Sequence, residues 1–344
     1  MGKLRVATIG AGYFSQFHHE AWAGMEEVDL VAVCDLDVEK ARGLAELWRI
    51  PATYTDASEM LDAEKPDLLD IIAPPAAHLE LIRLAAERGV PAAICQKAFC
   101  RSLAEAQEAT RVAEAADMRL IVHENFRFEP WHGEVKRRID ERLLGDLYQV
   151  GFRLRPGDGQ GPRAYLDRQP YFQKMERFLI HETAIHLIDV FRFFLGEVAT
   201  VTARLARLNP VIAGEDAGYV IFEFRSGARA LFDGNRLVDH RADNRRLTMG
   251  EMLVEGSTGI LRLDGYARLF HRAMGDNEER ELAYEWSNTG FAGDSVRRLQ
   301  RHVVEHLTRQ APEMNTAREY LANLRVEEAV YESASSGRTI EVAP

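Results

Sequence analysis

The stretch "LIHETAIHLIDVFRFFLG" (Leu179 to Gly196) combines acidic side chains and an imidazole at helical spacing. Glu182 and His186 are four residues apart, and Asp189 follows three residues later. On one continuous helix these three side chains would project from nearly one face. A carboxylate beside an imidazole raises its basicity and fixes its tautomer, as a general base requires. The stretch therefore predicts proton transfer by His186, although a helical polar stripe with one core histidine has the same pattern.

The sequence predicts no metal site. His181 and His186 are five residues apart and point away from each other on a helix, so this is not the HExxH zinc pattern. The three cysteines, Cys34, Cys95 and Cys100, form no Cys-x-x-Cys pair. Their number and spacing argue against a thiolate metal site or a disulfide framework, and favour a reducing cytoplasm.

A lysine stands directly after an apolar run in "CQKAF" (Cys95 to Phe99). Lys97 is therefore expected at the carboxyl edge of a parallel sheet, where such sheets bind ligands. An ammonium group there can polarise a substrate oxygen or stabilise an alkoxide. A solvated surface lysine is the alternative, but the position favours a functional group.

Two further stretches follow apolar strands. In "APPAAH" the prolines predict a rigid loop at the ligand edge, so Pro74 and His78 are candidate cofactor contacts, and His78 is alternatively a helix cap. In "HENFRF" the chain passes from one half to the other. Asn125 and Arg127 are expected beside the ligand there, with an interdomain ion pair as the equal alternative for Arg127.

Near the N-terminus, "VATIGAGYFSQFHHEAW" places a short apolar strand, two glycines and an amphipathic helix in a row. Gly10 allows a tight turn, and Gly12 lets the backbone approach a pyrophosphate at the helix N-terminus. Tyr13 and Phe14 complete the predicted turn. Asp35 ends the next strand, where an acid holds a ribose hydroxyl. Because no Arg follows it to receive a 2′-phosphate, NAD is favoured over NADP.

The elements that must position these residues differ between the two halves of the chain. Residues 1–125 alternate short apolar strands with helical stretches, which predicts a doubly wound parallel Rossmann sheet with right-handed crossovers. The expected strands are Leu4–Ile9, Leu30–Cys34, Leu68–Ala73, Ala92–Cys95 and Arg119–His123. Asp56 with Glu59, and Ser102 with Glu105, have the spacing of capping boxes.

Residues 126–344 predict an α+β domain with an open, largely antiparallel sheet and helices on one face. Strands are expected at Leu147–Arg155, Val220–Arg225, Ala228–Phe232, Met252–Glu255 and Gly259–Leu263. Helices are expected at about Pro130–Leu144, Phe178–Leu195, Asp294–Arg309 and Thr316–Ser335. The segment "RPGDGQGPRAY" between them is too rich in Gly and Pro for regular structure.

Charge and composition narrow the partners. The 344 residues carry a formal net charge of -11 and are 46% hydrophobic. Such a chain repels phosphate backbones and anionic lipid, so neither nucleic acid nor a membrane surface is expected as a partner. No apolar run approaches the roughly 20 residues of a membrane span, and no signal-peptide core is seen at the start.

These stretches, in this order, resemble the Gfo/Idh/MocA family of nicotinamide-dependent oxidoreductases over essentially the whole chain. The carriers are "IGAGYFSQFH", "AVCDLDVEKA", "IIAPPAAHLELIRLAAERGVPAAICQKAF", "HENFRF", "HETAIHLIDVFRFFLG" and "LRVEEAVYESASSGRTIEV". The resemblance implies a Rossmann domain, a C-terminal α/β domain whose open sheet serves a homodimer or homotetramer, and activity on sugars, polyols and related rings.

The same resemblance assigns roles to single residues. Lys97 matches the lysine of the family's Glu-Lys-Pro motif, His186 matches the general acid/base of its Asp-x-x-x-His motif, and Glu182 stands at that motif's Asp. Two residues depart from the pattern, because Gln96 replaces Glu and Ala98 replaces Pro. A Lys-Pro bond can be cis at little cost, whereas a Lys-Ala bond costs about 3 kcal/mol. Lys97 is therefore expected to be aimed differently, or the site to be weakened.

The segment "RLRPGDGQGPRAYLDRQPYFQKM" is similar to a subgroup of pentose dehydrogenases that includes those for the branched sugar D-apiose. The expected reaction is NAD-dependent oxidation of a small cyclic sugar, giving a lactone if the carbon is anomeric. Glu182 or Asp189 would steady the imidazolium of His186. Expected substrate contacts are Lys97, Arg127, Arg163, Tyr165, Tyr171, Glu182 and His186. The expected cofactor contacts named above are joined by Gln96 and Lys97.

Two other functions fit the same pieces. Relatives of this family include glycosidases that oxidise and then re-reduce the sugar, leaving NAD unchanged overall. A non-catalytic protein that binds NAD and a sugar to regulate a partner would also tolerate the changes at Gln96 and Ala98. Retention of Lys97, Glu182 and His186 together argues against such a sensor, because a sensor needs no base.

Overall fold

The computed structural model describes residues 2–309 and 311–343, which form two compact units. The first unit comprises the chain up to Asn125 together with Asp294–Ala322. The second comprises Phe126–Gly293 and the chain from Asn323 onward. The sequence-based division at 125 and 126 therefore omits a second segment of the first unit.

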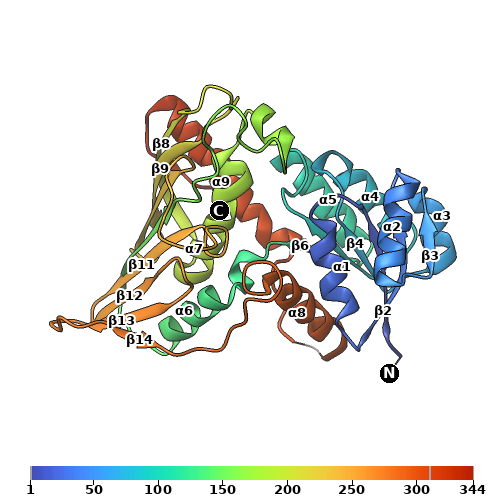
Figure 1. The fold of residues 1–344 in the computed structure, drawn as a ribbon, viewed down its shortest axis with the longest axis horizontal. Helices are drawn as coiled ribbons and strands as arrows, with labels where there is room; N and C mark the ends of the chain where they lie inside the picture. The colour runs from blue at the N-terminus through green and yellow to red at the C-terminus, as the bar shows by residue number, and fades with distance from the viewer. Residues whose placement is uncertain (1, 310, 344) are drawn as a thin grey trace. The chain divides into compact units, whose positions relative to one another are not determined.

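The first unit is built on a six-stranded parallel sheet, as the sequence predicts (Figure 1). Its strand order is β3-β2-β1-β4-β5-β6, the doubly wound order of a Rossmann domain. The strands are β1 (Leu4–Ile9), β2 (Val28–Cys34), β3 (Ala52–Tyr54), β4 (Leu68–Ile71), β5 (Ala92–Gln96) and β6 (Arg119–His123). Sequence patterning missed β3 because it has only three residues and they are partly exposed.

Helices connect these strands and are capped as expected. They are α1 (Ser15–Ala23), α2 (Val38–Trp48), α3 (Ala57–Glu64), α4 (Pro75–Glu87) and α5 (Leu103–Ala115). Asp56 accepts hydrogen bonds from the backbone N–H groups of Ser58 and Glu59, and Ser102 accepts one from Glu105. Both predicted N-caps are therefore confirmed.

The segment added to the first unit contains α8 (Ser295–Arg309), which packs against α1. Val296, Leu299 and Val303 recur at helical spacing and are buried, so α8 needs an apolar partner surface. Long-range packing of this stripe, rather than chain continuity, assigns the segment to the Rossmann unit.

The second unit contains a nine-stranded sheet of order β14-β13-β12-β11-β7-β10-β9-β8-β15. Within this sheet, only β7 and β10 pair in parallel among the described strands, so the sheet is largely antiparallel, as predicted. The strands are β7 (Leu147–Leu154), β8 (Val198–Ala206), β9 (Ala217–Phe224), β10 (Arg229–Asn235), β11 (Gly250–Gly256), β12 (Gly259–Leu263), β13 (Leu269–Ala273), β14 (Arg280–Leu282) and β15 (Ile340–Glu341).

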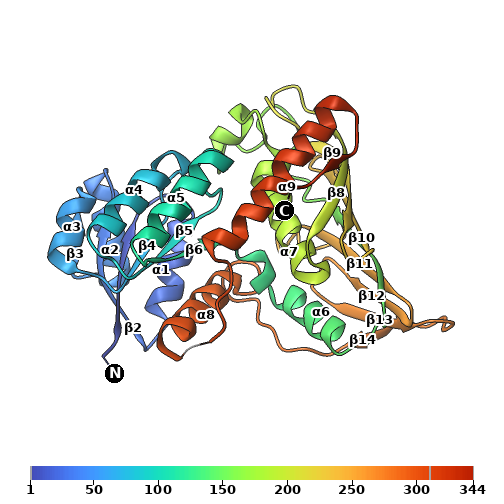
Figure 2. The ribbon, with the colours of Figure 1, turned by 180° about the vertical axis from the view of Figure 1, so that it is seen from behind.

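The helices of this unit lie on one face of its sheet. In both views α6 (Pro130–Asp140) and α7 (Ile185–Leu195) lie on the same face, and α7 contacts β7 and β10 (Figures 1 and 2). Two 3-10 helices, η1 (Phe126–Phe128) and η2 (Pro170–Lys174), and a π-helix, η3 (Leu179–Ala184), lie beside them in the sequence. The long helix α9 (Ala317–Ser336) begins in the first unit and ends in the second.

Within residues 2–309 and 311–343, no helix is long and apolar enough to cross a membrane.

Candidate functional site

On the first unit, the predicted cofactor residues follow the carboxyl ends of neighbouring strands. Gly10 follows β1, Asp35 follows β2, Lys97 follows β5 and Asn125 comes shortly after β6. Pro74 lies three residues beyond the end of β4 and immediately before α4. Because all these strands are parallel, the five residues share one edge of the sheet, the edge at which doubly wound sheets bind dinucleotides.

The first turn contains two glycines, and each position holds glycine for a different structural reason. Gly10 has a φ of +109°, and a Cβ there would lie 2.5 Å from the carbonyl oxygen of Ile72. The turn therefore requires glycine at this position. A Cβ built on Gly12 meets nothing within 4 Å, and Gly12 is exposed. Gly12 thus faces open space that leaves room for a bound pyrophosphate, whereas Gly10 is required by the conformation of the turn.

The start of α1 and the end of β2 complete this cradle. No side chain caps the N-terminus of α1 at Phe14. Asp35 accepts a hydrogen bond from the backbone N–H of Ala11 at 2.7 Å and another from that of Asp37 at 2.9 Å. Its carboxylate is thus held beside the glycine turn. An uncapped helix N-terminus fits a pyrophosphate, and a fixed carboxylate fits a ribose, so these residues fit a nicotinamide dinucleotide.

The different surroundings of the two glycines can be tested by a substitution at Gly12. The variant Gly12→Val should keep the melting temperature but raise the dissociation constant for NAD by about tenfold or more, because the isopropyl group fills the ligand's approach. Gly43→Val is the matched control, since a Cβ on Gly43 of α2 also meets nothing within 4 Å. Calorimetric titration with NAD and thermal unfolding measure both effects. Equal NAD affinities for the two variants would contradict the assignment.

His78 has a structural role. It is fully buried in α4, its Nε2 donates to the carbonyl oxygen of Ala73 at 2.8 Å, and its Nδ1 accepts from the N–H of Cys100 at 3.2 Å. Desolvation lowers the pKa of His78 to about 4, so the ring is neutral. His78 is not a helix cap, because no side chain caps the N-terminus of α4. Its two ring nitrogens instead tie together the loops after β4 and β5.

The segment after β5 also overturns one expectation. The Lys97–Ala98 peptide bond is cis, so alanine in place of proline does not prevent that geometry here. Ala98 and the following Phe99 are buried. Gln96 is buried too, and its Oε1 accepts the backbone N–H of Lys97 at 2.8 Å.

The remaining cofactor candidates of this unit differ in exposure. Asn125 is buried and its amide donates to the hydroxyl of Ser295 at 2.7 Å. Tyr13 is exposed and Phe14 is half-buried at the start of α1. Pro74 is exposed, and its extended backbone leads into Pro75, the first residue of α4.

On the second unit, the predicted single helix over 178–195 is wrong. Residues Leu179–Ala184 form a π-helix, in which the N–H of Ile185 bonds to the carbonyl oxygen of Ile180, and α7 begins only after it. Buried Glu215 accepts hydrogen bonds from the N–H groups of Phe178 and Ile180, each at 3.1 Å. Such π-turns are held by tertiary contacts that periodicity does not encode.

His186 and Asp189 lie on α7 with separate partners. His186 is 5% exposed, and its ring stacks on that of Phe126 with centroids 4.0 Å apart. Asp189 accepts two hydrogen bonds from Arg127, at 2.7 and 2.5 Å, and a third from Asn323 at 2.8 Å. Because these bonds use both of its oxygens, Asp189 is assigned to Arg127 rather than to His186.

The ion pair of Arg127 therefore lies within the second unit, not between domains. Glu182 is half-buried in η3, and its negative charge contributes to a raised pKa of Tyr171, which desolvation lifts to about 12. Arg163 is exposed and pairs with Asp167 at 2.8 Å.

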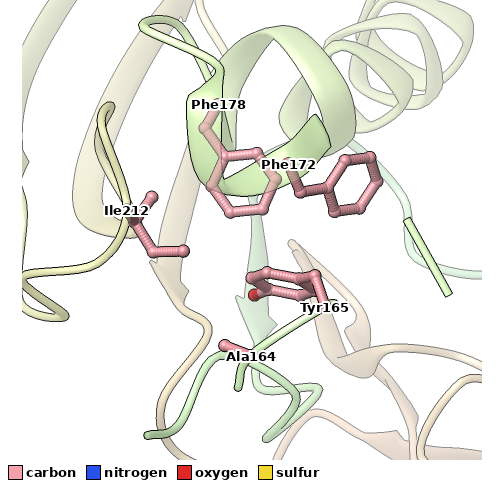
Figure 3. Packing of buried hydrophobic residues seen from close by; sticks show 5 residues of the cluster. All are labelled: Ala164, Tyr165, Phe172, Phe178 and Ile212. Carbon is pink, nitrogen blue, oxygen red and sulfur yellow. The ribbon is translucent and has the colours of Figure 1, made fainter. Parts of the chain in front are cut away.

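Tyr165 belongs to an aromatic cluster instead of a ligand surface. Its ring packs with Phe172 and Phe178 at centroid distances of 5.3 Å each (Figure 3). Its hydroxyl accepts a hydrogen bond from buried Arg236 at 2.8 Å and donates to Asp158 at 3.2 Å. The sequence predicts a sugar contact here because the tyrosine stands in a polar loop, and that prediction is wrong. The loop folds inward around Arg236, which also donates to Thr183 of η3 at 2.6 Å.

Among the residues that the structure describes, no group of three or more His, Cys, Asp or Glu side chains is arranged to hold a metal ion. Sequence reasoning missed two other groups. Arg236 gave no periodic signal. Asp70 is detectable from composition, because it is a charged residue inside the apolar run "LLDII" of a buried strand.

Models of a known family match both units. Residues 4–124 match the GFO_IDH_MocA model, described as an oxidoreductase family with an NAD-binding Rossmann fold. Residues 132–262 match the GFO/IDH/MocA C-terminal domain. These ranges correspond to the cradle-bearing sheet and to the unit that carries His186.

Similar proteins extend the match over nearly the whole chain. A D-apiose dehydrogenase of Paraburkholderia graminis is 34% identical over 99% of this chain and 90% of its own length. Another D-apiose dehydrogenase, from Rhizobium rhizogenes, is 30% identical over 99% and 98%. A solved oxidoreductase of Agrobacterium radiobacter, in complex with NAD+, L-tartaric acid and magnesium, is 29% identical with a TM-score of 0.89 and covers 99% of this chain and 98% of its own. The chain belongs to the Gfo/Idh/MocA family of oxidoreductases.

Proposed function

We propose that this oxidoreductase is an NAD-dependent dehydrogenase that oxidises a hydroxyl of a small cyclic sugar, with D-apiose as the first candidate. The observation that carries the substrate class is the identity of 34% and 30% to two D-apiose dehydrogenases along nearly the full chain. If the reacting carbon is anomeric, the product is a lactone. The cradle formed by Gly10, Gly12 and Asp35 supports the assignment of NAD as the cofactor.

Bound NAD would accept the hydride that leaves the sugar carbon. The protein's own residues do the rest. His186 takes the proton of the reacting hydroxyl, and its stacking on Phe126 at 4.0 Å limits the orientation of the imidazole. The ammonium of Lys97 stabilises the negative charge that develops on the oxygen. Glu182 steadies the imidazolium, since Asp189 is engaged by Arg127 and Asn323.

Contacts to the remaining sugar hydroxyls are assigned to exposed or half-buried groups. Tyr171 and Arg163 fit this role, because both side chains are exposed. Tyr165 is withdrawn from it, since its hydroxyl is used by Arg236 and Asp158. Arg127 is assigned to orienting Asp189 and α7.

Asp35 supports NAD over NADP. Its carboxylate is held by the N–H groups of Ala11 and Asp37, so it would repel a 2′-phosphate placed where the ribose hydroxyl binds. The variant Asp35→Asn keeps an acceptor oxygen but loses the charge. It should reduce the preference for NAD over NADP, measured as the ratio of kcat/KM values, by about tenfold. An unchanged ratio would remove Asp35 as the discriminating residue.

We further propose that the protein forms a homodimer or homotetramer through the outer face of the nine-stranded sheet. Ile221, Leu231, Gly151 and Leu253 lie directly opposite one another on neighbouring strands and form an apolar row. Their face is opposite to the buried one, and Ile221 is 39% exposed. Leu231→Glu should convert the oligomer to monomers in light scattering. Wild-type protein that is already monomeric would refute this interface.

The cytoplasm is the proposed location. Cys34, Cys95 and Cys100 are free and buried. Desolvation raises the pKa of Cys34 to about 11 and that of Cys100 to about 12, which keeps these thiols protonated and unreactive.

The deciding experiment mixes the purified protein with NAD or NADP and a panel of pentoses, hexoses and inositols, and follows reduced nicotinamide by absorbance. Turnover with D-apiose and NAD, with a lactone product, is the expected result. A changed sugar without net reduced nicotinamide would favour cofactor-retaining chemistry. NAD and sugar binding without any turnover would favour a sensor.

A further inference from the structure

A chain of buried polar groups runs beneath the loop that carries Lys97. Asp70 lies in the middle of β4 and is fully buried. Its Oδ2 contacts Nδ1 of His18 at 2.8 Å and accepts the indole N–H of Trp22 at 2.7 Å. Nε2 of His18 lies 3.0 Å from Nε2 of Gln96. Gln96 then reaches the backbone of Lys97, so four groups connect the sheet interior to the loop.

The direction of every hydrogen bond in this chain follows from its last member. The backbone N–H of Lys97 can only donate, so the atom of Gln96 that it meets at 2.8 Å is the carbonyl oxygen. The amide nitrogen of Gln96 therefore faces His18 and donates to it. Nε2 of His18 must then be an unprotonated acceptor, and its proton is on Nδ1, where it is donated to Asp70. The chain fits a neutral His18 in one tautomer.

We propose that Asp70, His18 and Gln96 form a one-way hydrogen-bond chain that positions the backbone of Lys97, and that Gln at 96 is the residue that matches a neutral His18. The positioning role rests on the proposed function of Lys97. The tautomer and the match between Gln96 and His18 do not depend on that function. Gln96 thus donates a hydrogen bond to His18, whereas a carboxylate at this position would need to accept one from it.

A carboxylate at 96 would change the proton count. Glutamate accepts the N–H of Lys97 equally well, but it has no proton to donate to Nε2 of His18. In Gln96→Glu the buried pair of residues 18 and 96 must therefore take up one proton, on either member, to restore the contact. The other titratable groups around the chain are His19 on α1, His123, whose ring lies 4.1 Å from that of His18, and Cys95 beside Asp70. None of them supplies this proton without breaking the direct contact between residues 18 and 96.

The extra proton gives Gln96→Glu a pH dependence with a definite sign. In the folded variant the pair binds a proton more tightly than the separate groups do in the unfolded chain, so its folded pKa is raised. Stability from this pair is present at low pH and is lost as pH rises through that folded pKa. The melting temperature of Gln96→Glu should therefore fall relative to wild type as pH increases from about 6 to 9. The wild-type chain needs no added proton, so the melting temperature of wild type should not have this additional pH dependence.

Nitrogen-15 NMR of histidine-labelled protein tests the wild-type tautomer directly, with His18→Asn to assign the signal. We expect a protonated Nδ1 and an unprotonated Nε2 near neutral pH. A proton on Nε2, or a cationic ring, would overturn the one-way chain. This measurement does not require activity, and it decides the inference even if Gln96→Glu fails to fold.

Kinetics test the positioning role. Gln96→Met removes the acceptor for the N–H of Lys97 and should lower kcat by about tenfold while the NAD dissociation constant and the sugar KM change little. The ratio of the kcat of Gln96→Glu to that of wild type at the same pH should be highest at low pH and should fall as pH rises. Gln300→Met is the matched control for a buried amide, because Gln300 donates only a long hydrogen bond of 3.5 Å to Oδ2 of Asp70, the member of the chain farthest from Lys97. Its kcat should equal that of wild type.

Two results would contradict the positioning role. One is an unchanged kcat for Gln96→Met, and the other is an equal loss in Gln300→Met. Failure of the proposed function looks different, because then wild type itself does not oxidise sugars, while the NMR tautomer and the pH-dependent melting of Gln96→Glu are still measurable. The inference about the chain and the inference about the reaction therefore fail separately.

Discussion

Replacing His186 with asparagine is expected to lower kcat for sugar oxidation by about 10²–10⁴-fold, the usual contribution of a positioned general base. The imidazole is nearly buried and stacks on Phe126, so few orientations are open to it. Asparagine keeps polarity at the site but has no nitrogen that can accept the proton near neutral pH. The loss should fall on kcat, measured by the absorbance of reduced nicotinamide under saturating sugar and NAD.

Two measurements separate this loss from unfolding. The NAD dissociation constant of His186→Asn should match that of wild type, because Gly10, Gly12 and Asp35 belong to the other compact unit. His271→Asn makes the same substitution on β13 of the same unit and should leave kcat unchanged. Retained turnover in His186→Asn would eliminate this residue as the base.

Replacing Lys97 with methionine is expected to lower kcat by about 10²–10³-fold, as removal of one group that stabilises a developing oxyanion does. Methionine keeps much of the side-chain length and apolar stem but removes the charge. Lys97 stands directly after β5, and Gln96 and Ala98 on either side of it are buried. The backbone of this loop should therefore stay in place, which thermal unfolding can check.

The control for this variant is Lys3→Met, which removes an exposed ammonium from the same unit and should not affect kcat. Lys97→Met should lower kcat far more than it weakens NAD binding. A variant with wild-type kcat would show that Lys97 is a solvated lysine, the alternative that its sequence context leaves open. Full activity in both Lys97→Met and His186→Asn would overturn the proposed mechanism.

Sequence periodicity was sufficient for most of the sheet architecture. Five of the parallel strands were expected close to their observed positions because a strand buried on both faces is a short continuous apolar run. Strands β3, β8, β13, β14 and β15 were missed. Strands β3, β14 and β15 have only two or three residues, and most residues of β8 and β13 are not fully buried, so neither group leaves a clear pattern. Capping residues such as Asp56 were also readable, because a cap acts within three residues of itself.

The part of the candidate site that lies within short stretches of sequence was predictable for the same reason, because its residues act on near neighbours in the chain. The turn at Gly10 and Gly12 and the acid at Asp35 follow from a strand, a turn and a helix that are contiguous in sequence. Lys97 was placed at the ligand edge simply because it follows a buried strand. Such assignments need no knowledge of distant residues.

Tertiary structure alone decided the rest, because the partners are far apart in sequence. The amino-acid sequence determined the Rossmann strands, the glycine turn and the residues available for proton transfer. It did not determine that Glu215 caps a π-helix before α7, that Arg127 takes both oxygens of Asp189, or that Arg236 draws Tyr165 into an aromatic core. Nor did it show that Gln96 meets His18, 78 residues away. A buried polar group must find a hydrogen-bond partner, and only the folded chain decides which distant side chain supplies it.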